Sequence, residues 1–155
     1  MRVITSHLHD PHSSGVAHDE ALESVGRCLR IGDMRLGVAT PAAVNKAISR
    51  RFLNDGWAKD VKIAGSRLSV SYLRDRIAVC VQLGNVSRTY ADLLKMQTLI
   101  ASGRINIAVE VVPAIGASKL MGSNHASFER LVRDLDLFKT TIVGPILVVG
   151  LENDH

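Results

Sequence analysis

The chain has 155 residues, 46% of them apolar, which is enough for one well-filled hydrophobic core and too little for several. We therefore expect a single domain over residues 1–155. Nineteen Lys and Arg against 15 Asp and Glu give a formal net charge of +4, which permits a polyanionic partner such as DNA without requiring one. Two widely separated cysteines exclude a secreted-type disulfide framework, and no apolar run approaches the ~20 residues of a membrane helix. These features predict a soluble, cytoplasmic protein.

The first part of the chain is predicted to hold an irregular arm followed by two helices. Within residues 1–15 the sequence is mostly polar and contains many residues that break helices and strands, so we expect an irregular N-terminal arm there. Apolar positions then recur with helical spacing over 19–31, which predicts a helix. A second helix is expected over 40–54, because Thr40 can cap its first turn and Pro41 suits the first helical position.

The middle of the chain changes from helical to alternating periodicity. Apolar residues alternate over 63–72 and again over 77–83, which predicts two strands joined by a connection at 73–76. A helix that opens at Ser87 or Thr89 follows, and a glycine ends it.

The C-terminal part predicts two more strands and one helix. Residues 105–112 alternate and end at Pro113, as expected of a strand. Residues 123–138 form the clearest amphipathic pattern, and the nearly continuous apolar run at 145–151 is typical of a strand covered on both faces. The element order predicts an α/β fold with a mixed central β-sheet flanked by helices.

Strand geometry is expected to bring three side chains of the middle strands together. Residues two apart on a strand point the same way, so Cys80 and Gln82 should face one side of the sheet. If residues 69–72 pair as the preceding antiparallel strand, Ser71 lies beside them. This is the geometry in which an Asp and a Glu on two adjacent strands would hold a metal ion.

The spacing of these residues resembles that of the PD-(D/E)xK restriction endonucleases of the BglII and BstYI kind. In that family the stretch reads Asp, eight residues, Glu, one residue, Gln, with Asn three residues after the Gln. Here Ser71 stands at the Asp position and Cys80 at the Glu position. Gln82 and Asn85 are kept.

The resemblance covers roughly residues 54–152 and implies a restriction-endonuclease-like core. The segments that carry it, besides the spacing above, are 54–57, 61–63, 107–113, 127–130 and 145–152. It also implies a homodimer that binds duplex DNA, and it leaves open a cognate methyltransferase as a partner. If the chain is active, the resemblance implies Mg²⁺ as its cofactor; if the chain is inactive, no cofactor is expected.

The two replaced acids decide what activity the resemblance implies. Ser71, Cys80 and Gln82 occupy the family's catalytic positions. Mg²⁺ prefers hard oxygen ligands, whereas Ser71 offers a neutral hydroxyl and Cys80 a soft thiol with an ordinary pKa of about 8.5. We therefore expect a restriction-endonuclease-like DNA-binding protein in which cleavage is lost or weakened.

Other interpretations of the same residues stay open. Ser71 and Cys80 are ordinary small strand residues in one interpretation and parts of a rebuilt metal site in another. In the second, Glu110 on the non-core face of the neighbouring strand is the substitute metal ligand, while Asp75 at a turn is expected to be solvated. The alternative functions are an active Mg²⁺-dependent type II restriction endonuclease and a non-catalytic protein-interaction subunit.

Candidate DNA contacts follow from the resemblance and from charge. Asn85, Arg74, Arg76, Lys119 and Arg130 are the residues that we expect near DNA, since cationic side chains bind phosphates.

The N-terminal arm and the residues just after it also hold four histidines, whose spacing would suit Zn²⁺ or Ni²⁺. They are His7, His9, His12 and His18. A polar arm that contains proline rarely fixes ligand geometry, so a histidine metal site is the less favoured interpretation and contact with DNA is the other.

Overall fold

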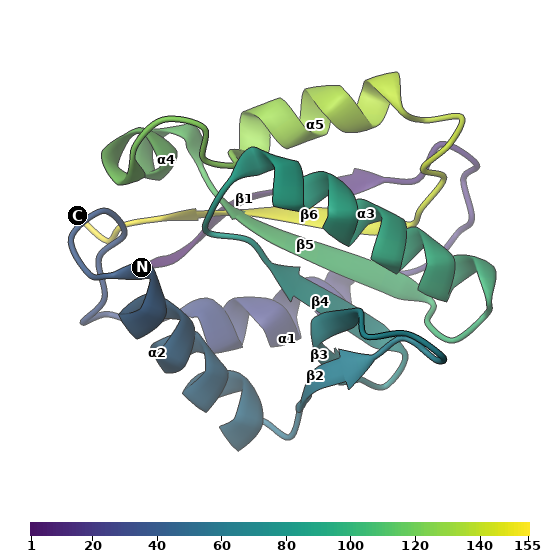
Figure 1. Ribbon diagram of the computed structural model, residues 1–155, viewed down its shortest axis with the longest axis horizontal. Coiled ribbons are helices and arrows are strands. Elements are labelled where there is room, and N and C mark those ends of the chain that lie inside the picture. Colours follow the sequence, from purple (N-terminus) through teal and green to yellow (C-terminus); the bar gives the residue numbers. More distant parts are fainter.

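The computed structural model describes residues 1–155 and shows a six-stranded mixed sheet covered by helices on both faces (Figure 1). Along the chain the elements are β1 (Arg2–His9), α1 (Asp19–Leu29), α2 (Pro41–Asn54), β2 (Ala58–Lys62), β3 (Ser69–Arg74), β4 (Ile77–Val81), α3 (Val86–Ala101), β5 (Ile107–Pro113), α4 (Ile115–Met121), α5 (Phe128–Leu137) and β6 (Ile146–Glu152). The predicted α/β fold with a mixed sheet is confirmed. None of the helices combines the length and the apolar character that a membrane crossing requires.

The sheet has a parallel centre and antiparallel edges. Its strand order is β1-β6-β5-β4-β3-β2, with β4, β5 and β6 parallel and the remaining neighbours antiparallel. Parallel neighbours need long crossovers, which α3 and the α4–α5 segment provide. All seven residues of β5 are buried, because helices cover both faces of the central strands.

Two hydrophobic cores flank the sheet, and Figure 1 shows the helices that enclose them. Helices α1 and α2 cover one face, where Leu29, Ile48 and Phe52 are fully buried. Helices α3 and α5 cover the other face, where Leu93 and Leu135 belong to the second core. Each face of β4 and β5 therefore lies under its own helical layer.

Helix caps explain where two of the helices begin. Thr40 precedes α2, and its side chain accepts a hydrogen bond from the Ala43 amide at 3.2 Å, as predicted. Helix α3 begins earlier than Ser87 or Thr89, because Asn85 caps it. The Asn85 side-chain oxygen accepts from the Ser87 amide at 2.8 Å.

The prediction of an irregular arm over residues 1–15 is wrong for its first part. Residues Arg2–His9 form β1, which pairs antiparallel with β6 in a register that runs from Arg2 opposite Glu152 to His9 opposite Ile146. An edge strand is held by backbone hydrogen bonds along one side, so half of its residues stay exposed, only His9 is buried, and polar residues are tolerated.

The predicted helix over 123–138 is also corrected. Helix α5 begins only at Phe128, and a separate short helix, α4, precedes it. Gly122 and Asn124 both have positive φ angles, of 125° and 58°. That backbone conformation interrupts a helix, so the chain turns between α4 and α5.

Asp55, just after α2, connects both helices of one face to the sheet. Its carboxylate accepts hydrogen bonds from Arg74 of β3 at 3.0 Å and from the Trp57 indole at 3.3 Å. The Cys28 thiol of α1 lies 3.6 Å away, and the Arg74 guanidinium lies over the Trp57 ring. Burial alone would raise the pKa of Asp55, but the hydrogen bonds from Trp57 and Arg74 hold it below the ordinary value.

We predict that Asp55→Ala lowers the free energy of unfolding by about 1–2 kcal/mol, because it removes charge-assisted hydrogen bonds at a partly exposed position. Urea unfolding at neutral pH measures the change. Asp136→Ala, at an exposed position of α5, is the matched control and should change stability by less than about 0.5 kcal/mol. Equal effects of the two substitutions would contradict a connecting role for Asp55.

Candidate functional site

The side chains of Ser71, Cys80 and Gln82 gather on the face of the sheet that α3 covers. Strand β3 pairs with β4, and the Ser71 hydroxyl oxygen accepts a hydrogen bond from the Val81 amide at 3.2 Å. Gln82 donates to Asp92 of α3 at 3.3 Å, and the Cys80 thiol lies close to the same carboxylate. The strand period thus correctly predicted a shared side for Cys80 and Gln82.

A buried cluster of three potential metal ligands lies beneath α3. Cys80 of β4 stands directly opposite Glu110 in the parallel register with β5, and Asp92 approaches from the helix. One ligand atom from each residue lies within 4.8 Å of the others. Cys80 is 2% exposed, Asp92 6% and Glu110 0%. We call these three residues the buried cluster.

Glu110 lies deeper than the sequence suggested. It was expected on a non-core face, but α3 covers that face and the carboxyl group is fully buried. Neither of its two oxygens receives a hydrogen bond from a donor group, and Asp92, itself an acceptor, can pair with Glu110 only through a proton on one of the two carboxyl groups. Burial raises the pKa of Glu110 well above its ordinary value, and the negative charge of Asp92 raises it further. Burial and the neighbouring Asp92 therefore both favour the protonated, neutral form of Glu110.

The Cys80 thiol is also kept neutral by its surroundings. Burial raises the pKa of Cys80 well above its ordinary value, and negative charge on Glu110, when that group is ionised, and on Asp92 acts in the same direction. A thiol must ionise to act as a nucleophile, so in the absence of a metal ion Cys80 is inert.

Asp92 and Lys95 were not recognised from the sequence. They lie one turn apart on α3, with the Lys95 ammonium 3.0 Å from Asp92 Oδ1. Burial alone would lower the pKa of Lys95, but the hydrogen bond and charge of Asp92 raise it, so the ammonium stays charged. A signal was present, because Asp92 shares the spacing of the buried residues Met96 and Leu99 on α3.

A cavity of about 310 Å³ adjoins the buried cluster and reaches it through Asp92. Ser71 and Gln82 line this cavity together with Lys95 and with Asp60 of β2. The polar lining gives water access to the edge of the cluster. We call this space the Ser71 cavity.

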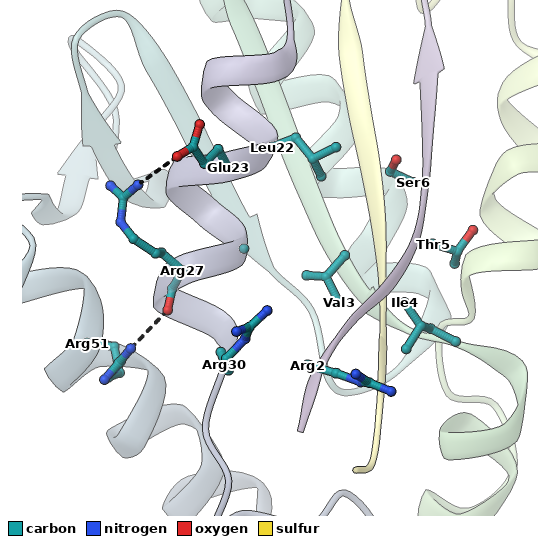
Figure 2. Close-up of a pocket in the computed structure, with 11 residues that line it drawn as sticks. Arg2, Val3, Ile4, Thr5, Ser6, Leu22, Glu23, Arg27, Arg30 and Arg51 are labelled. Atoms are coloured by element: carbon teal, nitrogen blue, oxygen red, sulfur yellow. Dashed lines mark hydrogen bonds and ion pairs between the residues drawn. The ribbon is translucent and has the colours of Figure 1, made fainter. Parts of the chain in front are cut away.

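A larger cavity, of about 520 Å³, lies between β1 and α1. Figure 2 shows four arginines around it, which are Arg2, Arg27, Arg30 and Arg51. Arg27 turns back to Glu23 at 3.8 Å, while Arg30 projects into the space between α1 and β1. We call this the arginine cavity. This cavity was not predicted from the sequence, because residues 1–15 were expected to be irregular, whereas β1 forms one of the cavity's walls.

The structure separates the candidate DNA contacts into engaged and exposed residues. Arg74 donates a hydrogen bond to Asp55 at 3.0 Å, and its contact with DNA stays a prediction. Arg76 donates to Gly103 O at 2.6 Å, and Asn85 caps α3. Lys119 and Arg130 are exposed on α4 and α5. Their contact with DNA stays a prediction.

A histidine metal site is contradicted by the arrangement of the N-terminal segment. His9 is buried and donates to the Ile142 carbonyl, whereas His7 and His12 are exposed. No three of the four histidines come together with other potential ligands, and the buried cluster is the one group of that kind in the chain. His7 and His9 lie on the same side of β1, because residues two apart on a strand point the same way, but His9 is bonded to the Ile142 carbonyl, and His12 and His18 lie beyond the end of the strand.

This fold and site define a restriction-endonuclease-like protein. The chain matches the family model described as restriction endonuclease BglII/BglIII over residues 16–151, and it belongs to that family of metal-dependent restriction endonucleases. No curated protein sequence matches it.

Two solved structures show the same fold. The crystal structure of restriction endonuclease BglII complexed with a DNA 16-mer has a TM-score of 0.75 and 15% sequence identity, covering 99% of this chain and 78% of that chain. The crystal structure of free BglII has a TM-score of 0.68 and 14% identity, covering 97% and 81%.

Mg²⁺ does not fit the donor set of this chain. It requires near-octahedral oxygen coordination and keeps several waters. The Ser71 oxygen is neutral and accepts from a backbone amide, Cys80 supplies sulfur, and Glu110 is closed off from solvent. The family's two acidic positions therefore supply no anionic oxygen to the cavity, the Asp92 carboxylate that lines it is paired with Lys95, and Glu110 has no space for a hydrated ion around it.

We predict that Glu110→Gln makes stability less dependent on pH. Because the folded pKa is raised, the folded state holds a proton that the unfolded chain releases above about pH 4.3. The stability of the unaltered protein should therefore fall as pH rises, by up to about 1.4 kcal/mol per unit from this group, and the variant should lack that loss.

Urea unfolding between pH 5 and 7.5 with a chelator present measures this difference. Glu20→Gln, at an exposed position, is the control and should leave the pH slope unchanged. Identical slopes for the unaltered protein and Glu110→Gln would mean that Glu110 is ionised in the folded state.

Proposed function

We propose that this chain binds duplex DNA as a homodimer and cleaves it weakly or not at all. The observation that carries the proposal is the chemistry at the family's two acidic positions. Ser71 has its oxygen bound to the Val81 amide, and Cys80 is a buried neutral thiol. A catalytic metal ion must hold a phosphate oxygen and activate a water, and neutral ligands support that poorly.

DNA binding is supported by family membership and by charge. BglII was crystallised in complex with a DNA 16-mer, and this chain shares its fold. The arginine cavity brings four arginines together in a chain with a net charge of +4, and of these Arg30 and Arg51 have no ion-pair partner, whereas Arg2 pairs with Asp154 and Arg27 with Glu23 and Asp55. Arginines suit phosphate contacts because the guanidinium donates two parallel hydrogen bonds.

An active endonuclease is the second candidate, and one observation favours it. Asp92 and Glu110 place two carboxyl groups beside the Ser71 cavity, with Lys95 next to them. In that case Glu110 would be essential, and Glu110→Ala would abolish cleavage. The poor fit of Mg²⁺ to the buried cluster makes this the weaker candidate.

We predict that the unaltered chain gives no discrete fragments from unmethylated plasmid or phage DNA with Mg²⁺ or Mn²⁺. Ser71→Asp combined with Cys80→Glu should cut, because it restores two carboxylates at the family positions. Gel electrophoresis of the digests measures both. Discrete fragments from the unaltered chain would overturn the loss of cleavage.

The single variant Ser71→Asp provides a second test in case the double variant does not fold. Ser71 is half-buried at the cavity, so an Asp fits there more easily than a Glu fits at the packed Cys80 position. We expect Ser71→Asp to melt like the unaltered chain and to bind Mg²⁺ more tightly. Unchanged Mg²⁺ affinity in a folded Ser71→Asp variant would also count against the proposed cause of inactivity.

We predict that duplex DNA binding weakens steeply with added salt and that Arg30→Gln lowers the salt slope by about 0.9, the value for one phosphate contact. Fluorescence anisotropy between 50 and 200 mM salt measures the slope. Lys139→Gln, an exposed charge removed on another surface, is the matched control. Absence of salt-dependent binding would favour the protein-interaction subunit instead.

A further inference from the structure

We propose that Cys80, Asp92 and Glu110 bind one thiophilic divalent transition-metal ion, such as Zn²⁺, with its remaining coordination position open to the Ser71 cavity. The proposal does not depend on DNA binding or cleavage. It concerns a metal different from the Mg²⁺ that the family resemblance implies.

Glu110 is the observation that points to a missing ligand. A buried carboxyl group normally has hydrogen-bond partners, because burial removes its water without replacement. Glu110 is fully buried on an otherwise apolar strand, yet no donor group reaches either oxygen, and a proton shared with Asp92 would satisfy only one of them. Cys80 and Asp92 lie on the side that these oxygens face, within 4.8 Å by one ligand atom each. A cation at that point would satisfy the orphaned oxygens.

The cluster geometry suits a small four-coordinate ion. Zn²⁺ has bonds of about 2.0–2.2 Å to carboxylate oxygen and about 2.3 Å to sulfur, which places tetrahedral ligands roughly 3.3–3.8 Å apart. The observed spread of 4.8 Å closes to this separation by small side-chain rotations. The three ligands come from two paired strands and a packed helix, so their backbones are fixed.

Charge balance also favours a divalent ion. A thiolate and two carboxylates carry three negative charges, and the Lys95 ammonium beside Asp92 supplies one positive charge. A divalent cation brings the total to zero in a region that excludes water. Buried charge is tolerated only when it is compensated in this way.

Sulfur selects the class of metal. Thiolates bind Zn²⁺ and other borderline or soft ions well, whereas Mg²⁺ takes oxygen ligands and sheds its water reluctantly. The buried cluster has one sulfur and two oxygens. The Ser71 cavity reaches Asp92, which gives an ion a path into the cluster and a water for the open position.

Cobalt binding tests the proposal without DNA. The full chain, stripped with a chelator, is titrated with Co²⁺ and followed by absorption, because a thiolate–cobalt bond gives a near-ultraviolet charge-transfer band. We expect one Co²⁺ per chain with that band, displacement of Co²⁺ by Zn²⁺ but not by a large excess of Mg²⁺, and a higher melting temperature with Zn²⁺.

The two free buried cysteines supply a matched control. Cys80→Ser should lose the charge-transfer band, whereas Cys28→Ser, in the other core, should keep it. Glu110→Gln and Asp92→Asn should each weaken Co²⁺ binding at least tenfold, and these variants keep the proposal testable if Cys80→Ser fails to fold. No band in the unaltered chain, or an equal band in Cys80→Ser, would overturn the proposal while leaving the proposed DNA binding intact.

Discussion

The structure depends on one unusual constraint, which is a carboxyl group fully buried in the central strand of the sheet. Glu110 lies between two apolar neighbours on β5, under α3, and no donor group forms a hydrogen bond to its carboxyl oxygens. A group of this kind can be kept neutral, or it can be matched by a cation. Both solutions involve the same neighbours, because only Asp92 and Cys80 lie within reach. The properties of the site follow from this single placement.

The fold explains how these neighbours are held in position. The parallel register of β4 and β5 sets Cys80 opposite Glu110, and the crossover helix α3 between these strands carries Asp92 over them. A right-handed crossover must pack back on the sheet it connects, so the helix covers the strands that it joins. On the opposite face, Asp55 attaches β3 to α1 and α2 through Arg74 and Cys28.

Periodicity predicted the parts of the fold that depend on local sequence. Helix α2, the antiparallel pair β3–β4 and the buried strand β6 all followed from spacing and caps, and the strand period gave Cys80 and Gln82 a common side. Strand β1 was missed because backbone pairing with β6 holds it, and its polar side chains give no alternating signal. Asp92 was missed because a charged residue on a helix is ordinarily expected to face solvent. Its burial follows only from the packing of α3 on the sheet. The depth of Glu110 depends on the same packing.

Cys80 bears on both the Mg²⁺-dependent cleavage and the thiophilic metal binding considered for this site. A Glu at that position would add a third carboxyl group next to Asp92 and Glu110 and would favour a hard ion with oxygen ligands. The thiol found there removes one negative charge under neutral conditions and favours a softer ion when it ionises. Under the two proposals above, weakened Mg²⁺ chemistry and a preference for a thiophilic metal are consequences of the same residue. The fold leaves room for either chemistry, because the register that brings residue 80 to Glu110 is set by backbone pairing and not by the side chain.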